Sequence, residues 1–180
     1  PDYSGKVFSE QEIAEGQHRQ FVGGGWDTHG KRQLDYLVSQ GLQPHHRFLD
    51  VGCGSLRAGR HLVDYLEPGN YYGIDANASL IEAGYDHELT DEQRERLPLS
   101  NLRANDRFDG DFGVRFDYAL AQSVFTHVSL NHLRLCLVRL DPLMVEGGQF
   151  FATFFEQPSS TAVDEIVLVG QRPRFTERNI

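Results

Sequence analysis

The stretch FLDVGCGSLRAGRHL, residues 48–62, constrains the fold more than any other part of the sequence. The strand predicted over residues 47–53 contains a nearly continuous apolar run, which is typical of a strand covered by helices on both faces. Gly52 and Gly54 permit a tight turn and close backbone approach to a ligand. A helix is predicted from about residue 56 to residue 66, so the order strand, glycine turn, helix indicates an α/β fold.

The alternation of strand and helix continues along the chain. Further strands are predicted over residues 71–76, 101–106, 116–123 and 147–156. Strands that alternate regularly with helices pair in parallel through right-handed crossovers. We therefore expect an open, mostly parallel, Rossmann-like sheet with helices on both faces.

Three helices are predicted between the later strands from cap signals and apolar spacing. Capping-box spacings at Ser79-x-x-Glu82 and Thr90-x-x-Gln93 predict a helix toward His87 and a surface helix or lid over 90–97. The Asn77-Ala78-Ser79 sequon is interpreted as helix-start chemistry. An apolar helical stripe, ended or kinked by Pro142, comprises Leu130, Leu133, Leu137, Leu140 and Met144.

An N-terminal helical extension precedes the first strand. Ser9 and Glu12 have capping-box spacing and predict a helix through Arg19, and a second helix is predicted over 28–40. The run 23–25, three glycines, separates the two helices. We divide the single expected domain into an N-terminal segment (1–44), a Rossmann-like core (45–156) and a partial C-terminal segment (157–180), in which the C-terminal strands of the sheet are expected to be missing.

Composition excludes several classes of function. The net charge of −9 over 180 residues repels a phosphate backbone, so no nucleic-acid partner is expected. The only cysteines, Cys53 and Cys136, form neither a disulfide framework nor a metal-binding pair. No apolar run reaches the ~20 residues of a membrane span, and no signal peptide is recognised. We expect a cytoplasmic protein.

Polar residues follow three of the predicted strands. Asp75 comes 25 positions after Asp50, where an acidic side chain can accept both hydroxyls of a ribose, and Asn105-Asp106 follows the third strand. The carboxyl ends of parallel strands lie at one edge of the sheet, where ligands of such folds bind. A helix that begins near the glycine turn offers further unpaired N–H groups. These features predict a nucleoside-containing ligand.

Two cofactors fit such a loop. A dinucleotide fingerprint requires glycine at position 57, where this chain has Arg57. The stretch instead resembles motif I of the class I S-adenosylmethionine-dependent methyltransferases, Asp/Glu-x-Gly-x-Gly-x-Gly. Asp50, Gly52 and Gly54 match that motif, and Leu56 replaces its last glycine. YYGIDA, FDYALAQSVFTHV and LMVEGGQFFATF resemble the later motifs of the same family.

The resemblance covers roughly residues 20–156 and implies S-adenosylmethionine as cofactor. It implies that the backbone of Gly52, Cys53 and Gly54 approaches the methionine part, and that Asp50 holds its ammonium directly or through water. The Cys53 side chain is interpreted as a small buried filler rather than a nucleophile.

The resemblance also assigns residues after the second, third and fourth strands. These are Asp75 at the ribose, Asp106 at the adenine, and Ala121 and Gln122 beside the sulfonium. Ala76 is assigned to the cofactor site next to Asp75, and Asp109 and Asp111 are close alternatives to Asp106. His127 is the candidate general base, and its alternative role is to pack or to cap the next helix. His18, Trp26 and His29 are candidates to close over the donor or to shape an acceptor pocket; core packing is the alternative for Trp26.

The acceptor is narrowed by the motifs that this sequence lacks. Residues 121–124 read Ala-Gln-Ser-Val in place of the Asp/Asn-Pro-Pro-Tyr of enzymes that methylate amino groups of DNA and RNA bases. The sequence shows neither the glutamate pair of protein arginine methyltransferases nor a carboxylate cluster for a metal, so no metal is expected. The predicted function is methyl transfer to a small-molecule or glycan acceptor, at oxygen. The alternatives are a non-catalytic nucleoside-binding regulatory domain and a nicotinamide-dependent reductase; the oligomeric state is left open.

Overall fold

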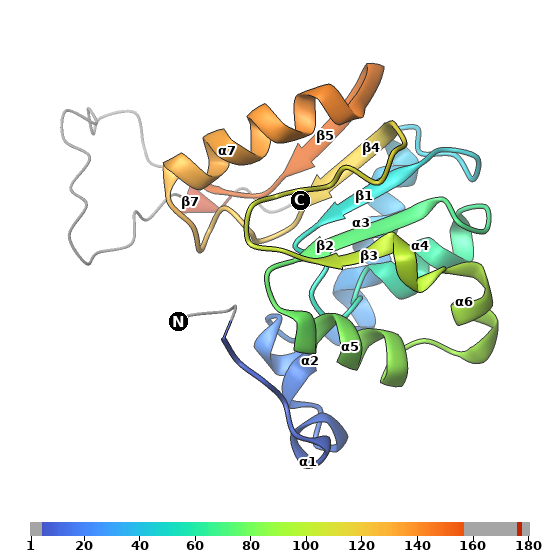
Figure 1. Cartoon of the computed structure of the whole chain (residues 1–180), viewed down its shortest axis with the longest axis vertical. Helices are drawn as coiled ribbons and strands as arrows, with labels where there is room; N and C mark the ends of the chain where they lie inside the picture. Colours follow the sequence, from blue (N-terminus) through green and yellow to red (C-terminus); the bar gives the residue numbers. More distant parts are fainter. Residues whose placement is uncertain (1–4, 157–175, 178–180) are drawn as a thin grey trace.

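The computed structural model describes residues 5–156 and 176–177, and its centre is a parallel sheet with the strand order β3-β2-β1-β4-β5 (Figure 1). The strands are β1 (Phe48–Val51), β2 (Tyr71–Asp75), β3 (Leu102–Ala104), β4 (Phe116–Ala121) and β5 (Met144–Ala152). Each neighbouring pair runs parallel, with β1 in the middle. The expected open α/β sheet is confirmed.

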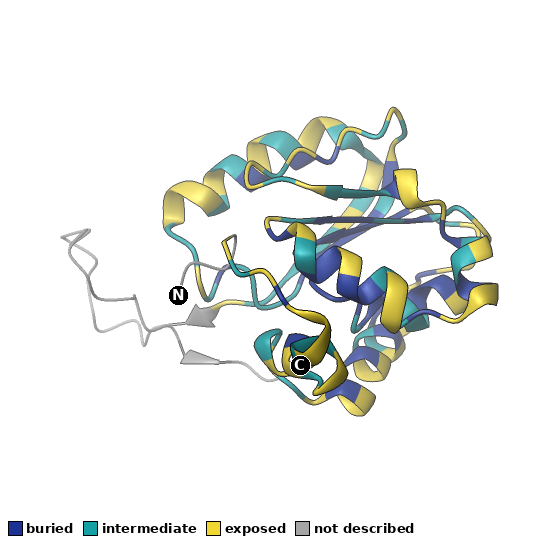
Figure 2. Ribbon diagram, turned by 60° about the horizontal axis from the view of Figure 1, so that its bottom comes forward, coloured by how far each residue is buried: buried dark blue, intermediate teal, exposed yellow. Residues whose placement is uncertain are grey.

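Helices cover both faces of this sheet. The helices α3 (Trp26–Ser39), α4 (Gly59–Tyr65) and α5 (Ala78–His87) pack on one face, in a core that includes Leu37, Leu62 and Ile81. On the other face α7 (Leu130–Leu140) packs through Cys136 and Leu140 against the side chains of β1 and β4. Figure 2 shows the buried residues concentrated in the sheet and on the inner sides of these helices. Burial on both faces explains the apolar run of β1.

The first predicted helix is two short helices. They are α1 (Glu10–Ala14) and α2 (Gln17–Phe21), with Gly16 between them at a φ of +73°. The left-handed backbone of Gly16 ends α1, and only glycine adopts it at little cost. The predicted capping box is present, because Ser9 and Glu12 exchange side-chain and backbone hydrogen bonds.

The predicted cap of α5 is wrong, because Asn77 and not Ser79 caps the helix. The Asn77 side chain accepts a hydrogen bond from the Leu80 N–H at 3.1 Å, which confirms its interpretation as helix-start chemistry. Ser79 lies in the first turn, and its Oγ accepts a hydrogen bond from the backbone N–H of Phe8 at 3.0 Å. Helix α6 (Asp91–Arg96) has the predicted Thr90 cap, and its Gln93 amide donates to the Arg60 carbonyl of α4. Helix α6 therefore packs on α4 as a surface helix.

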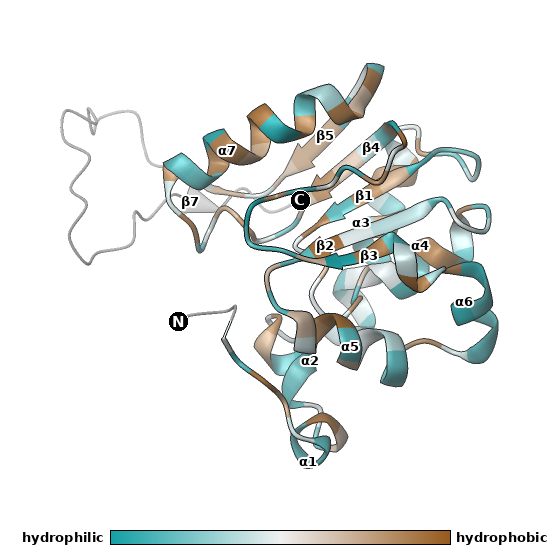
Figure 3. Cartoon of the chain, viewed as in Figure 1, coloured by the Kyte–Doolittle hydropathy of each residue, from teal (hydrophilic) through white to brown (hydrophobic). Residues whose placement is uncertain are grey.

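The apolar stripe of α7 is buried only in part. Cys136 and Leu140 face the sheet, whereas Leu130 and Leu137 are 47% and 46% exposed. Figure 3 shows apolar and polar positions alternating along α7. The helix contacts the sheet through a narrower stripe than predicted, and a short 3-10 helix, η2 (Asp141–Leu143), links it directly to β5, which begins three residues before the predicted strand.

The end of the predicted fifth strand belongs to a separate pair. Strand β6 (Phe155–Glu156) pairs antiparallel with β7 (Thr176–Glu177). The rest of the predicted C-terminal segment, including the strands expected to be missing there, lies outside the described residues. Among the described helices, none has the length and apolar character needed to cross a membrane.

Helix α4 begins at Gly59 rather than at residue 56, because Leu56 has a φ of +62°. This left-handed conformation costs an L-residue about 1–2 kcal/mol. The Leu56 side chain is fully buried in the core under α4. The position where the family motif has glycine thus retains the backbone that favours glycine, and core packing offsets its cost.

Leu56→Gly is expected to destabilise the protein no more than Leu56→Ala. Both variants lose the buried side chain at a cost of about 2–5 kcal/mol, and glycine relieves the strained backbone. Leu62, buried inside α4, is the matched control, where glycine is expected to cost about 1 kcal/mol more than alanine. Urea unfolding of the four variants checks this; the same glycine penalty at both positions would show that Leu56 is not strained.

Candidate functional site

The carboxylate of Asp75, at the end of β2, joins two loops. Its Oδ2 accepts a hydrogen bond from the Gly54 N–H and its Oδ1 accepts one from the Asn77 N–H, both at 2.8 Å. Burial raises the pKa of Asp75, and the bonds from Asn77 and Gly54 oppose that shift. The predicted ribose acid and the loop between β1 and α4 (residues 52–58, called the glycine loop below) therefore lie in direct contact at the carboxyl edge of the sheet.

The glycine loop is bound to the end of β2 and is bordered by two valines. Gly52 and Gly54 have φ values of +79° and +53°, which favour glycine. A Cβ placed on Gly52 would lie 2.4 Å from Val124 Cγ2, and one placed on Gly54 would lie 2.8 Å from Val22 Cγ1. The two glycines thus allow the backbone to approach side chains from other parts of the chain.

Asp50 lies inside the sheet, below the glycine loop. The residue is 3% exposed, and its Oδ2 accepts a hydrogen bond from the Tyr71 hydroxyl at 2.8 Å. Burial raises the pKa of Asp50 to about 7, with a smaller contribution from the charge of Asp75, while the Tyr71 bond and the charge of Arg57 lower it. The Asp50 carboxylate is therefore buried in the core and bonded to Tyr71.

Cys53 occupies the same loop with its thiol turned inward. Its Sγ lies 3.0 Å from the position that a Cβ of Gly73 would take, so Gly73 leaves room for the thiol. Burial raises the pKa of the Cys53 thiol well above its usual range, followed by the charges of Asp75 and Asp50. A thiol of this kind is a poor nucleophile, as expected of a small core residue.

The end of β3 lies beside the end of β2. The Asn105 N–H donates to the Asp75 carbonyl at 2.8 Å, and the Asn105 side chain bonds to the backbone of Arg107 and Asp109. Asp106 is exposed in the turn that Asn105 organises, and Asp109 pairs with Arg103 at 3.5 Å. Ala76 is exposed next to Asp75. These residues are at the edge where the sequence predicts ribose and adenine contacts.

The end of β4 carries the residues predicted at the sulfonium. Ala121 is fully buried, and Gln122 is half-buried with its amide donating to Ser123 Oγ at 3.1 Å. His127 is exposed in the turn between β4 and α7, and its backbone N–H donates to the Val124 carbonyl at 3.0 Å. Because Ser129 occupies the N-cap of α7, His127 is neither in the core nor at the cap position.

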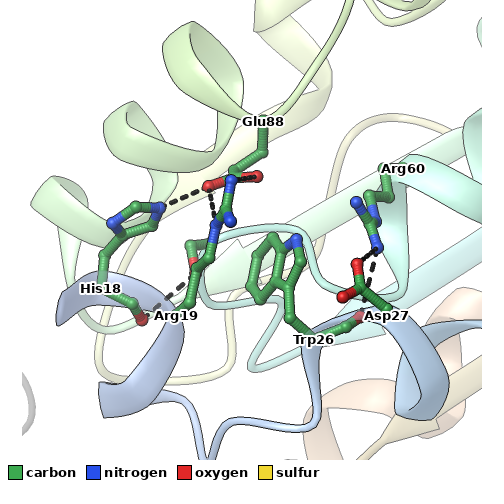
Figure 4. A network of polar contacts seen from close by, with 7 residues as sticks. His18, Arg19, Trp26, Asp27, Arg60 and Glu88 are labelled. Atoms are coloured by element: carbon green, nitrogen blue, oxygen red, sulfur yellow. Dashed lines mark hydrogen bonds and ion pairs between the residues drawn. The ribbon is translucent and has the colours of Figure 1, made fainter. Parts of the chain in front are cut away.

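Two of the three N-terminal candidates, His18 and Trp26, lie in a network of polar contacts (Figure 4). His18 Nε2 lies 2.5 Å from Glu88 Oε1, and Arg19 donates to both Glu88 oxygens at 2.7 and 2.9 Å. The Trp26 ring, in a residue 8% exposed, lies between the guanidinium groups of Arg19 and Arg60. His18 and Trp26 are therefore core residues of the N-terminal segment, whereas His29 is exposed.

Four residues at or near the site were missed in the sequence: Val22, Arg57, Glu88 and Val124. The sequence marks Arg57 only as a departure from the dinucleotide motif, whereas in the structure it contacts the N-terminal segment directly. The glycine run 23–25 was the available signal, because such a run indicates a backbone that another part of the protein must hold. The described residues show no group of three or more side chains suited to a metal ion.

The parallel sheet, its glycine loop and the acidic end of β2 define a Rossmann-like domain of the S-adenosylmethionine-dependent methyltransferase class. The methyltransferase domain family matches residues 49–150, more than half of the chain. The chain belongs to this family.

Solved structures share the fold at low sequence identity. The glycopeptide N-methyltransferase MtfA, complexed with S-adenosylmethionine, aligns with a TM-score of 0.60 at 14% identity, over 71% of this chain and 55% of its own. Magnesium protoporphyrin IX methyltransferase from Synechocystis aligns with a TM-score of 0.55 at 16% identity, over 85% and 66%. The sugar N-methyltransferase KedS8 from Streptoalloteichus aligns with a TM-score of 0.59 at 19% identity, over 88% of this chain and 59% of its own. This chain thus spans between about half and two thirds of these enzymes.

The stability that depends on Asp50 is expected to fall as the pH rises through its pKa. The folded pKa of about 7 exceeds the ordinary value of 3.8, so the contribution is complete below pH 4 and is lost between about pH 4 and 7. The difference in unfolding free energy between wild type and Asp50→Asn should therefore decrease by about 2.5–3 kcal/mol from pH 5 to pH 8. Urea unfolding at several pH values measures it; a constant difference would mean that Asp50 titrates normally.

Proposed function

We propose that this chain binds S-adenosylmethionine and transfers its methyl group to a hydroxyl of a small-molecule or glycan acceptor. The observation that carries the proposal is the contact of the Asp75 carboxylate with the Gly54 N–H, which sets a ribose-binding acid against the glycine loop. The structural neighbours that methylate a glycopeptide and a sugar support an acceptor that is a glycan or another small molecule; they are N-methyltransferases, so the choice of oxygen is part of the proposal. A reducing location, the cytoplasm, agrees with two free and buried cysteines.

The residues present suit this donor. The Asp75 carboxylate accepts backbone bonds from Gly54 on one oxygen and from Asn77 on the other, and a carboxylate has about four acceptor sites in all, which leaves room for a ribose hydroxyl. Gly52 and Gly54 would present backbone to the methionine part, Asp106 would accept from the adenine amino group, and Ala121 and Gln122 would lie near the sulfonium. We assign Asp50 a role through water or through its charge, since it is buried.

The bound donor supplies an activated methyl group for in-line displacement. The protein must then align the acceptor, exclude water and receive a proton. His127 is the proposed base, because it is exposed in the turn after β4 and an imidazole accepts a proton near neutral pH.

Binding of S-adenosylmethionine and S-adenosylhomocysteine, without binding of NAD, is expected in calorimetry. Preference for NAD, or failure to bind either sulfur nucleoside, would contradict the proposal. Binding without transfer in an acceptor screen with labelled donor would favour the non-catalytic regulatory alternative. The atom of the product that carries the labelled methyl group then distinguishes transfer to oxygen from transfer to nitrogen.

Asp75→Ala is expected to weaken donor binding by about 1.5–3 kcal/mol, which is tenfold or more, because charge-assisted hydrogen bonds are lost. Asp86→Ala is the control, since Asp86 is exposed on α5 and its side chain is not assigned to the site. Titration calorimetry with S-adenosylhomocysteine measures both. Equal affinity of wild type and Asp75→Ala would remove Asp75 from the site.

His127→Ala is expected to lower kcat by about 100-fold or more with a hydroxyl acceptor, since general-base catalysis typically contributes that much. The rise of the rate with pH near the imidazole pKa should also disappear, while donor affinity is unchanged. His132→Ala, on the exposed side of α7, serves as the control. Measuring kcat across pH for both variants tests this role. Unaltered turnover in His127→Ala would show that His127 is not the general base.

A further inference from the structure

The turn at residues 22–25, between α2 and α3, lies against the glycine loop. It contains Gly23, Gly24 and Gly25, all with positive φ values between +57° and +95°. Such a run has more conformational freedom than any other sequence of its length, so contacts from outside the turn add to the order supplied by its local bonds, which run from the Gly23 and Gly24 N–H groups to the Gln20 and Arg19 carbonyls. These residues precede the region that matches the methyltransferase family.

Arg57 supplies contacts that hold this turn. Its Nη1 donates to the Val22 carbonyl at 2.9 Å and to the Gly24 carbonyl at 2.8 Å. The guanidinium is half-buried, and backbone carbonyls that bond to a charged donor in such surroundings form strong hydrogen bonds. One side chain of the glycine loop thus binds the carbonyls on both sides of Gly23.

The contact places Val22 at the donor site. Val22 Cγ1 lies 2.8 Å from the position that a Cβ of Gly54 would take, and the Gly54 N–H donates to Asp75. A shift of the turn would therefore move an apolar side chain that borders the glycine loop.

We propose that Arg57 is a positioning residue of the methyltransferase: by binding the carbonyls of Val22 and Gly24, it fixes Val22 as an apolar wall of the donor site beside Gly54. This inference rests on the proposed function, since it assigns the wall to the site where the donor binds. It also accounts for an arginine at the position where a dinucleotide-binding loop has glycine.

The rest of the N-terminal segment is held independently of Arg57. Glu88 binds both His18 and Arg19, as Figure 4 shows, and the backbone of Lys6 and Phe8 bonds to the side chains at the start of α5. Removing the Arg57 guanidinium is therefore expected to release residues 22–25 and to leave the helices before and after them in place.

Arg57→Met tests the positioning role, with Arg96→Met as a matched control. Arg96 is also half-buried and donates to two backbone carbonyls, those of Val63 and Leu66 at the C-terminal end of α4, away from the glycine loop. We expect Arg57→Met to weaken S-adenosylhomocysteine binding about tenfold and to raise hydrogen exchange at residues 22–25. Arg96→Met should lower stability to a similar extent with unchanged affinity.

The charge of Arg57 also lowers the pKa of Asp50, so the same comparison is made in the Asp50→Asn background. Loss of affinity in both backgrounds supports the positioning role; loss that disappears without the Asp50 carboxylate overturns it. Equal affinity of Arg57→Met and wild type also overturns it.

Val22→Ala provides a second test, because it keeps both hydrogen bonds from Arg57 to the backbone carbonyls. It can be measured even if Arg57→Met does not fold. It should weaken S-adenosylhomocysteine binding by roughly threefold or more, because part of the apolar wall is removed. Unchanged affinity in Val22→Ala would show that Val22 does not form part of the donor site and would overturn the proposal. If the wild-type protein binds no sulfur nucleoside, the proposed function itself is refuted. If the wild type binds and the variants bind equally well, only the positioning role of Arg57 is refuted.

Discussion

The hydrogen bonds of Asp75 hold the two central loops of the site in one arrangement. Through Gly54 they fix the turn after β1, and through Asn77 they fix the residue that caps α5. The turn after β1 sets where α4 begins. The cap of α5 sets the position of Ser79, whose hydroxyl oxygen accepts a hydrogen bond from the Phe8 N–H of the N-terminal segment. A carboxylate at the end of β2 therefore organises both crossovers around the middle of the sheet, in addition to any contact with a ligand.

The order of the elements was predictable from the sequence, because it depends on local patterns. Buried strands read as apolar runs, and the capping boxes at Ser9 and Thr90 are local hydrogen-bond motifs that formed as expected. The cap of α5 was not predictable in this way, since Asn77 and Ser79 are both good capping residues. In the structure both side chains also bond to distant residues. The Asn77 amide donates to the Lys6 carbonyl, and the Ser79 hydroxyl oxygen accepts from the Phe8 N–H.

The candidate site was predictable at the level of positions but not of orientations. Asp50 and Asp75 are both acids in strands of the sheet, and their spacing does not distinguish their orientations. Asp50 contacts Tyr71 in the core, whereas Asp75 contacts the glycine loop. The left-handed backbone of Leu56 was equally hidden, because leucine rarely adopts it and only the packing under α4 sustains it. Val22 and Arg57 meet across 35 positions, a distance at which sequence periodicity carries no information.

The charges of the site also bear on the kind of ligand it suits. Burial raises the pKa of both Asp50 and Asp75, so ionising these two neighbouring acids is costly in the protein as it stands. The nearby cation Arg57 is engaged with the carbonyls of Val22 and Gly24. A ligand that brings positive charge offsets this cost, whereas a pyrophosphate adds to it. S-adenosylmethionine carries a sulfonium, an ammonium and a carboxylate group and is positively charged overall, whereas the dinucleotides carry a pyrophosphate, so electrostatics and the glycine spacing favour the same donor for independent reasons.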